Sequence, residues 1–200
     1  MTANTTVLPF RPRPRRSEKV ISNGVLGMTL FVFVEIMLFA GFISAFVIIR
    51  ARAVGSVWPP PNQPRLPFEQ TAVNTSALLA SGILLLAAHR MHLKDRSPRA
   101  VGALLALATL LGSAFVFLQG VEWAALIGEG LTMTSSTYGS LFYTIIGAHA
   151  AHAVVAIGVL AWAWVRVARS NLSREAISSV AIFWYFVVLV WPFLYFQVYL

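Results

Sequence analysis

The sequence predicts an all-α fold, a polytopic membrane bundle of five transmembrane helices. Apolar residues make up 58% of its 200 residues and charged residues only 11%, whereas about a quarter of the residues in a soluble domain are charged. Long apolar runs recur along the chain, without the short alternating segments that are typical of a membrane β-barrel. The mean hydropathy of +0.75 also excludes intrinsic disorder, because disordered chains contain few aliphatic and aromatic side chains.

Five apolar runs approach or exceed the length of about 20 residues that a membrane-spanning helix needs. The first run ends at Arg50 and Arg52 rather than at a small-residue cleavage site, which predicts a spanning helix and not a signal peptide. Basic clusters follow the second and fourth runs, and no Lys or Arg follows the third or the fifth. The predicted spans are residues 24–49, 72–88, 101–118, 139–165 and 177–198.

The segments outside the spans predict the orientation of the chain. Residues 1–23 form a Pro/Arg-rich tail, in which proline disfavours helix and the charges repel, and residues 24–200 form the membrane domain. Trp58 precedes three prolines, which predicts a stiff loop with the indole at the membrane–water boundary. The tail and alternate loops hold 12 Lys and Arg residues, against 3 on the other side. The N-terminus is therefore expected in the cytoplasm and the C-terminus in the periplasm of a bacterial inner membrane.

Charge and cysteine content exclude several classes of function. The net charge of +8 comes from short basic clusters between apolar runs, without a basic face interleaved with aromatic residues, so nucleic acid is not an expected partner. The chain has no cysteine, which rules out a disulfide framework, a thiolate metal site and a cysteine nucleophile.

Glu35 is the clearest polar residue within a predicted span. It lies about eleven residues into the first span, roughly 16 Å from the inner surface at about 1.5 Å per residue. A lone carboxyl group at that depth is expected to be neutral or hydrogen-bonded to a partner. Two interpretations follow: the side chain handles protons or anchors another helix as part of a function, or it is a neutral acid that only joins two helices.

His149 and His152 form a second intramembrane feature, in the segment Gly147-Ala-His-Ala-Ala-His. Their spacing places both imidazoles on one helix face, and the small residues around them allow a close helix contact. His149 lies about 15 Å below the outer surface by the same helical rise, a depth similar to that of Glu35. We therefore expect an intramembrane polar cluster of Glu35, His149 and His152.

The remaining polar residues are expected near the two membrane surfaces. His89 and His92 repeat the spacing of the other histidines, which suggests a metal or bis-histidine haem site, but their depth near the inner surface does not match that of His149. The favoured interpretation is that His89 and His92, together with Arg166, contact lipid headgroups. Gln119 and Glu122 are expected as a solvated polar pair at the outer end of the third span. No catalytic, cofactor or metal site is predicted.

Seven short motifs occur in order along the five spans, and together they resemble subunit III of the haem–copper cytochrome oxidases. The motifs are Glu35 followed by Phe39-Ala-Gly-Phe, Trp58-Pro-Pro, Asn74-Thr-Ser followed by Leu79-Ala-Ser-Gly, Leu118-Gln-x-x-Glu122, Tyr138-Gly-Ser, Gly147-x-His-x-x-His152, and Trp184 with Trp191 and Tyr195. The resemblance extends from about Met28 to the C-terminus, and it implies a five-helix form that lacks the first two helices of the longer seven-helix form.

The resemblance implies a non-catalytic role in a terminal oxidase that reduces O₂ and pumps protons. Haem and copper are then expected in partner subunits, with subunit I as the main contact and subunit II and other respiratory subunits nearby. The family subunit binds phospholipid, stabilises subunit I and supports proton uptake. Its intramembrane glutamate, histidine pair and lipid-facing arginine match Glu35, His149 with His152, and Arg166.

The last span departs from the family pattern. Tyr185 stands where histidine is usual and Val188 where aspartate is usual, so a role of that pair is not expected here. Three other assignments stay open from the sequence: an accessory protein of nitric oxide reductase, a small independent transporter, and a stand-alone haem protein. The transporter is disfavoured because paired repeats and broken helices are not evident.

Overall fold

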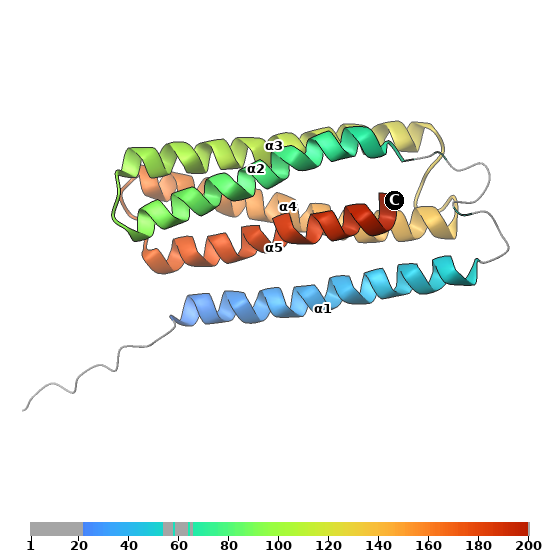
Figure 1. Ribbon diagram of the computed structural model, residues 1–200, viewed down its shortest axis with the longest axis horizontal. Coiled ribbons are helices and arrows are strands. Elements are labelled where there is room, and N and C mark those ends of the chain that lie inside the picture. The colour runs from blue at the N-terminus through green and yellow to red at the C-terminus, as the bar shows by residue number, and fades with distance from the viewer. Residues whose placement is uncertain (1–21, 54–57, 59–63, 65, 200) are drawn as a thin grey trace, which may run out of the picture.

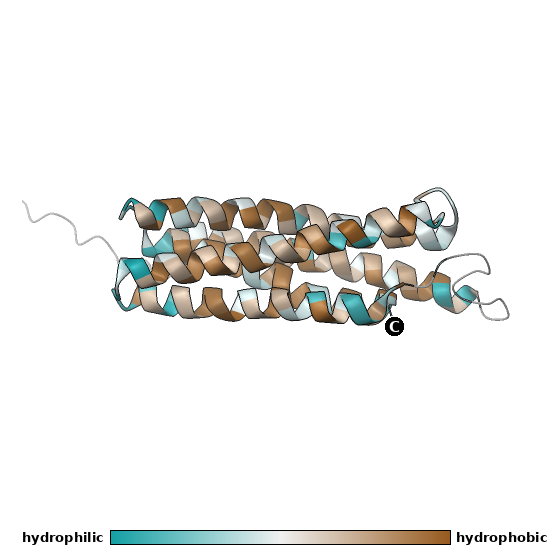
Figure 2. Cartoon of the chain, turned by 90° about the horizontal axis from the view of Figure 1, so that it is seen from above, coloured by the Kyte–Doolittle hydropathy of each residue, from teal (hydrophilic) through white to brown (hydrophobic). Residues whose placement is uncertain are grey.

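The computed structural model describes residues 22–53, 58, 64 and 66–199. This part of the chain is helical and contains no strand. Its elements are α1 (Asn23–Arg52), α2 (Phe68–Leu93), α3 (Pro98–Gly128), α4 (Thr137–Ala168) and α5 (Arg174–Tyr199). Each helix is long and apolar enough to cross a membrane, and Figure 2 shows the apolar residues along the helices with polar residues gathered toward their ends. The predicted all-α, five-helix membrane fold is confirmed. Most of the predicted tail and the three prolines after Trp58 lie outside the described residues.

Local sequence signals set several helix ends. The hydroxyl oxygen of Ser136 accepts a hydrogen bond of 3.0 Å from the Gly139 amide, which caps α4. Pro98 occupies the first turn of α3, where its missing N–H costs no helical hydrogen bond. At its other end α3 continues beyond Leu118 to Gly128, so the predicted third span was too short.

The five helices divide into a group of four and one outer helix. Helix α2 contacts α3 and α5, α3 contacts α4, and α4 contacts α5, so that α2–α5 enclose a common core. Helix α1 lies outside this group, mainly against α5 and with a small contact to α4, and Figure 1 shows it along the edge of the molecule. The arrangement places Glu35 of α1 opposite the α4–α5 side of the core.

Helix α5 supplies the largest buried side chains of the core. Trp184 and Trp191 are both fully buried. Trp184 reaches across to α3, where a Cβ atom on Gly112 would lie 2.5 Å from its ring. Val188 packs in the same way on α2, where a Cβ on Gly82 would lie 3.1 Å from it. Small residues on α2 and α3 therefore admit the bulky face of α5, as expected for helices that pack within a membrane.

Candidate functional site

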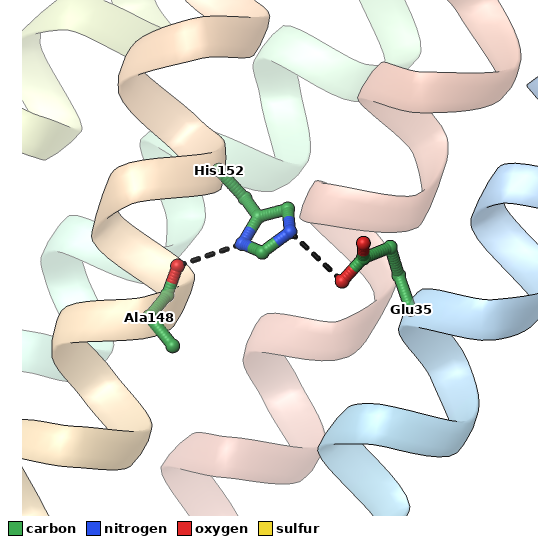
Figure 3. Close-up of polar contacts among 3 residues, drawn as sticks. All are labelled: Glu35, Ala148 and His152. Atoms are coloured by element: carbon green, nitrogen blue, oxygen red, sulfur yellow. Dashed lines mark hydrogen bonds and ion pairs between the residues drawn. The ribbon is translucent and has the colours of Figure 1, made fainter.

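Glu35 and His152 form a hydrogen-bonded pair between α1 and α4 (Figure 3). The Glu35 Oε2 atom lies 3.0 Å from His152 Nε2, and His152 Nδ1 lies 2.7 Å from the carbonyl oxygen of Ala148. The side chains are 15% and 19% exposed, respectively. The predicted contact between the acid and the histidine motif is thus present, through His152.

The second hydrogen bond of His152 determines which proton arrangements the pair can adopt. The Ala148 carbonyl only accepts, so Nδ1 of the imidazole must carry a proton. If the imidazole is neutral, its Nε2 accepts from a protonated Glu35; if the imidazole is charged, Nε2 donates to the carboxylate. In both states one proton lies between Oε2 and Nε2. The carboxyl group and the imidazole therefore share one proton within the membrane domain.

Aromatic rings surround His152. Phe39, Phe183 and Phe186 have ring centroids 5.5, 6.5 and 5.9 Å from that of the imidazole. These rings come from α1 and α5, so three helices enclose the pair. Phe39 and Phe186 also line an apolar groove of about 530 Å³ between α1 and α5. The pair therefore lies beside an apolar surface, where an unpaired charge would be costly.

His149 does not join this pair. Its side chain is 1% exposed, and its ring lies between Phe39 and Trp191, with centroid distances of 6.2 and 5.1 Å. Neither ring nitrogen has a hydrogen-bond partner among the described residues. Because three residues turn a helix by less than a full turn, His149 points toward α3 and α5 while His152 points toward α1.

Gln119 and Glu122 belong to a polar network between α2, α3 and the end of α5. Gln119 is 4% exposed, and its Nε2 donates to the Tyr199 hydroxyl at 3.1 Å. Glu122 is half-buried, and its Oε2 accepts from the Thr71 hydroxyl at 2.8 Å. The prediction of a solvated pair is wrong for Gln119, because α3 continues past it and turns its amide inward.

The sequence prediction missed three residues of α2 in this network: Thr71, Asn74 and Thr75. The Asn74 Nδ2 donates to the Phe115 carbonyl at 3.1 Å, and Thr75 Oγ1 accepts from Trp191 Nε1 at 2.8 Å. Their spacing of three and four residues within an apolar span puts them on one face. Polar residues at this spacing within an apolar span predict a polar stripe that faces the core.

At the other end of the bundle, His89 and His92 face protein. The Nε2 of His89 lies 3.1 Å from the Ser178 hydroxyl, and that of His92 lies 3.1 Å from the Leu172 carbonyl oxygen. One nitrogen of each ring is therefore bonded to the start of α5 or to the segment before it, and both side chains stay partly exposed. Their contact with lipid headgroups stays a prediction. Arg166 lies in the last turn of α4, with its guanidinium carbon 5.4 Å from the Trp162 ring centroid; its contact with a lipid headgroup stays a prediction.

The two departures in the last span lie inside the bundle. Val188 is buried against Gly82, and the Tyr185 hydroxyl is buried without a hydrogen-bond partner in the described part of the chain. No group of three or more His, Cys, Asp or Glu side chains within the described ranges could hold a metal ion.

The sequence matches the family model for cytochrome c oxidase subunit III over residues 15–200. Among its relatives, cytochrome c oxidase subunit 3 of Gadus morhua is 34% identical over 180 residues, which cover 86% of this chain and 67% of the relative. The same subunit of Pelomedusa subrufa is 32% identical over 187 residues, which cover 90% of this chain and 70% of the relative. The chain therefore belongs to the cytochrome c oxidase subunit III family.

Proposed function

We propose that this chain is the non-catalytic subunit III of a haem–copper terminal oxidase, and that it stabilises subunit I, binds lipid and supports proton uptake. Haem and copper are held by the partner subunits, and this chain has no redox centre of its own. By the distribution of Lys and Arg, the N-terminus lies in the cytoplasm and the C-terminus in the periplasm of a bacterial inner membrane.

The Glu35–His152 pair is the observation that carries the proposal. It combines a carboxyl group and an imidazole 3.0 Å apart within the membrane domain, which is the chemistry of a proton relay. Both side chains retain some exposure, so lipid or a partner subunit can contact the pair from outside the bundle. The pair joins the outer helix to the core, so it also supports the placement of α1.

The outer surface of α1 supports a role in contacting a partner or lipid. Phe33, Val34 and Met37 are each more than half exposed within the described residues. Apolar side chains on this face are suited to the membrane or to a subunit I helix. Arg166, whose guanidinium lies near Trp162 at the opposite end of α4 from Ser136, is suited to an anionic lipid headgroup.

The test is purification of the complex through an affinity tag on this chain, followed by native mass spectrometry, optical spectroscopy and turnover measurements. We expect subunits I and II to co-purify. Glu35→Gln is expected to leave the haem and copper spectra unchanged, and to slow proton uptake during O₂ reduction because the amide cannot exchange a proton.

The matched control is Glu69→Gln, which alters an exposed acid in the first turn of α2. This variant is expected to keep both the spectra and the rate of proton uptake. Loss of haem from the Glu35→Gln complex would contradict a non-catalytic role, and so would isolation of the chain without an oxidase partner. An unchanged rate of proton uptake in Glu35→Gln would contradict only the proposed role in proton uptake.

A further inference from the structure

A cavity of about 210 Å³ lies between α3 and α4, separate from the Glu35–His152 pair. Apolar side chains make up most of its wall, and Trp191 lines it from α5. Three polar side chains also line it: Gln119, Trp123 and His149. At its rim, Val154 is more than half exposed and Gly120 is exposed, so the cavity opens toward the outside of the bundle.

Buried polar atoms without partners converge on this cavity. Both ring nitrogens of His149 and the indole Nε1 of Trp123 are buried and lack a hydrogen-bond partner in the described residues. Asn74 Oδ1 is also buried without a partner. Asn74 does not line the cavity, but its amide nitrogen bonds the carbonyl of Phe115, which does. A buried polar group without a partner costs free energy, and a low-dielectric surrounding increases that cost.

The chemistry of these atoms selects the kind of ligand. A neutral imidazole has one donor and one acceptor nitrogen, the indole N–H is a donor, and the amide oxygen is an acceptor. Only a ligand that both donates and accepts hydrogen bonds can satisfy all of these atoms. An acyl chain does neither, and an anion would satisfy only the donors, whereas water does both.

We propose that this cavity is a hydration site, in which ordered water molecules bond the ring nitrogens of His149 and bridge toward Trp123 and Asn74. The volume of the cavity is several times the roughly 30 Å³ that one water molecule occupies in the liquid. Neither Glu35 nor His152 lines this cavity, and Phe39 packs against both imidazoles, with centroid distances of 6.2 Å to His149 and 5.5 Å to His152. Water at His149 thus extends the Gln119 network and does not reach the Glu35–His152 pair.

The test uses the intact complex that contains this chain, with ¹⁵N-labelled histidine, and transfers nuclear polarisation from water to nearby nitrogens in solid-state NMR. The signal of His149 is identified as the one that disappears in His149→Phe. We expect transfer from water to this signal in the unmodified complex. Gly120→Leu, which adds a side chain at the rim of the cavity, is expected to abolish the transfer.

Two further variants keep the experiment decisive. Gly158→Leu adds the same side chain on α4 at an exposed position outside the cavity, where a Cβ meets no atom within 4 Å, and it is expected to leave the transfer unchanged. If Gly120→Leu fails to assemble, Ala150→Leu fills the cavity from α4. Absence of transfer in the unmodified complex would overturn the proposal, as would full transfer in an assembled filled variant. Cryo-EM density for an acyl chain or a partner side chain in the cavity would also overturn it.

Discussion

Helices α1 and α5 are both strongly apolar and lie side by side, yet α1 is at the edge of the molecule and α5 is in its core. Within the apolar stretch of each helix, only 11% is buried in α1, against 56% in α5. The difference lies in their neighbours. Gly112 and Gly82 on α3 and α2 accept Trp184 and Val188 of α5, whereas a Cβ added at Gly27 or Gly41 of α1 would meet no atom within 4 Å. Apolar character places a helix in the membrane, and close matching of large and small residues places it in the core.

Helix α1 buries only Phe39 and Phe46, and two hydrogen bonds add to its attachment. The Gly24 amide donates to Glu175 Oε1 of α5 at 2.7 Å, and Glu35 bonds His152 of α4 farther along. The comparison thus contrasts a densely packed helix with one that is held by two buried phenylalanines and separate hydrogen bonds. Substitutions in α5 and its contact positions are expected to cost more than those in α1.

The largest effect is expected from Trp191→Ala in α5. The fully buried indole packs against Phe115 with a centroid distance of 4.9 Å and bonds Thr75. Removing such a side chain costs about 3–5 kcal/mol in the free energy of unfolding, measured by SDS titration in mixed micelles with circular dichroism. Trp191→Phe keeps most of the ring and is expected to lose only about 1 kcal/mol for the missing hydrogen bond. Equal losses in the two variants would show that packing of the Trp191 ring is not its main contribution to the free energy of unfolding.

Gly112→Ala sharpens the comparison because its effect should differ in sign from that of Gly41→Ala. The added methyl group at Gly112 collides with the rigid Trp184 ring, which is expected to cost about 1–3 kcal/mol. At Gly41 the methyl group meets nothing, so the better helix propensity of alanine should stabilise α1 by about 0.5–1 kcal/mol. The same titration measures both. Destabilisation by Gly41→Ala would mean that α1 packs more closely than described.

His152→Leu tests the polar attachment of α1. Loss of the hydrogen bond to Glu35 is expected to cost about 1 kcal/mol, within the range measured for polar contacts between membrane helices. Removing both partners in the Glu35→Leu, His152→Leu double variant should recover much of that cost, since no polar group stays unpaired. A double-mutant cycle on the unfolding free energies measures the coupling, and additive effects would refute a direct link.

The smallest effect is expected from Met37→Leu on the outer face of α1. This side chain is 62% exposed, and exchange of one apolar group for another there should change the free energy of unfolding by less than about 0.5 kcal/mol. In the assembled oxidase, dissociation of the chain during native electrophoresis gives a second measurement. A clear loss in the assembled complex but not in the isolated chain would identify this face as a contact with another subunit.

The five spans and the depth match of Glu35 with the histidine motif follow from the sequence, because length, hydropathy and helical rise are local properties. The direction of a side chain is different. Lipid and a protein core are equally apolar, so hydropathy could not tell that Gln119 faces inward or that His89 contacts Ser178. His149 and His152 share a motif, yet only His152 has a hydrogen-bond partner on α1, whereas Phe39 of α1 packs against both rings. Such differences depend on tertiary contacts that one sequence does not contain.

The contact of α1 with α5 has a consequence for biosynthesis. Helix α1 leaves the ribosome before the other four, and its main neighbour in the finished protein leaves last. Until α4 has been made, Glu35 lacks the imidazole of His152, its hydrogen-bond partner in the finished protein. Helix α1 is therefore made first but gains its main neighbour last, so it stays in the membrane as a separate helix until α5 is in place.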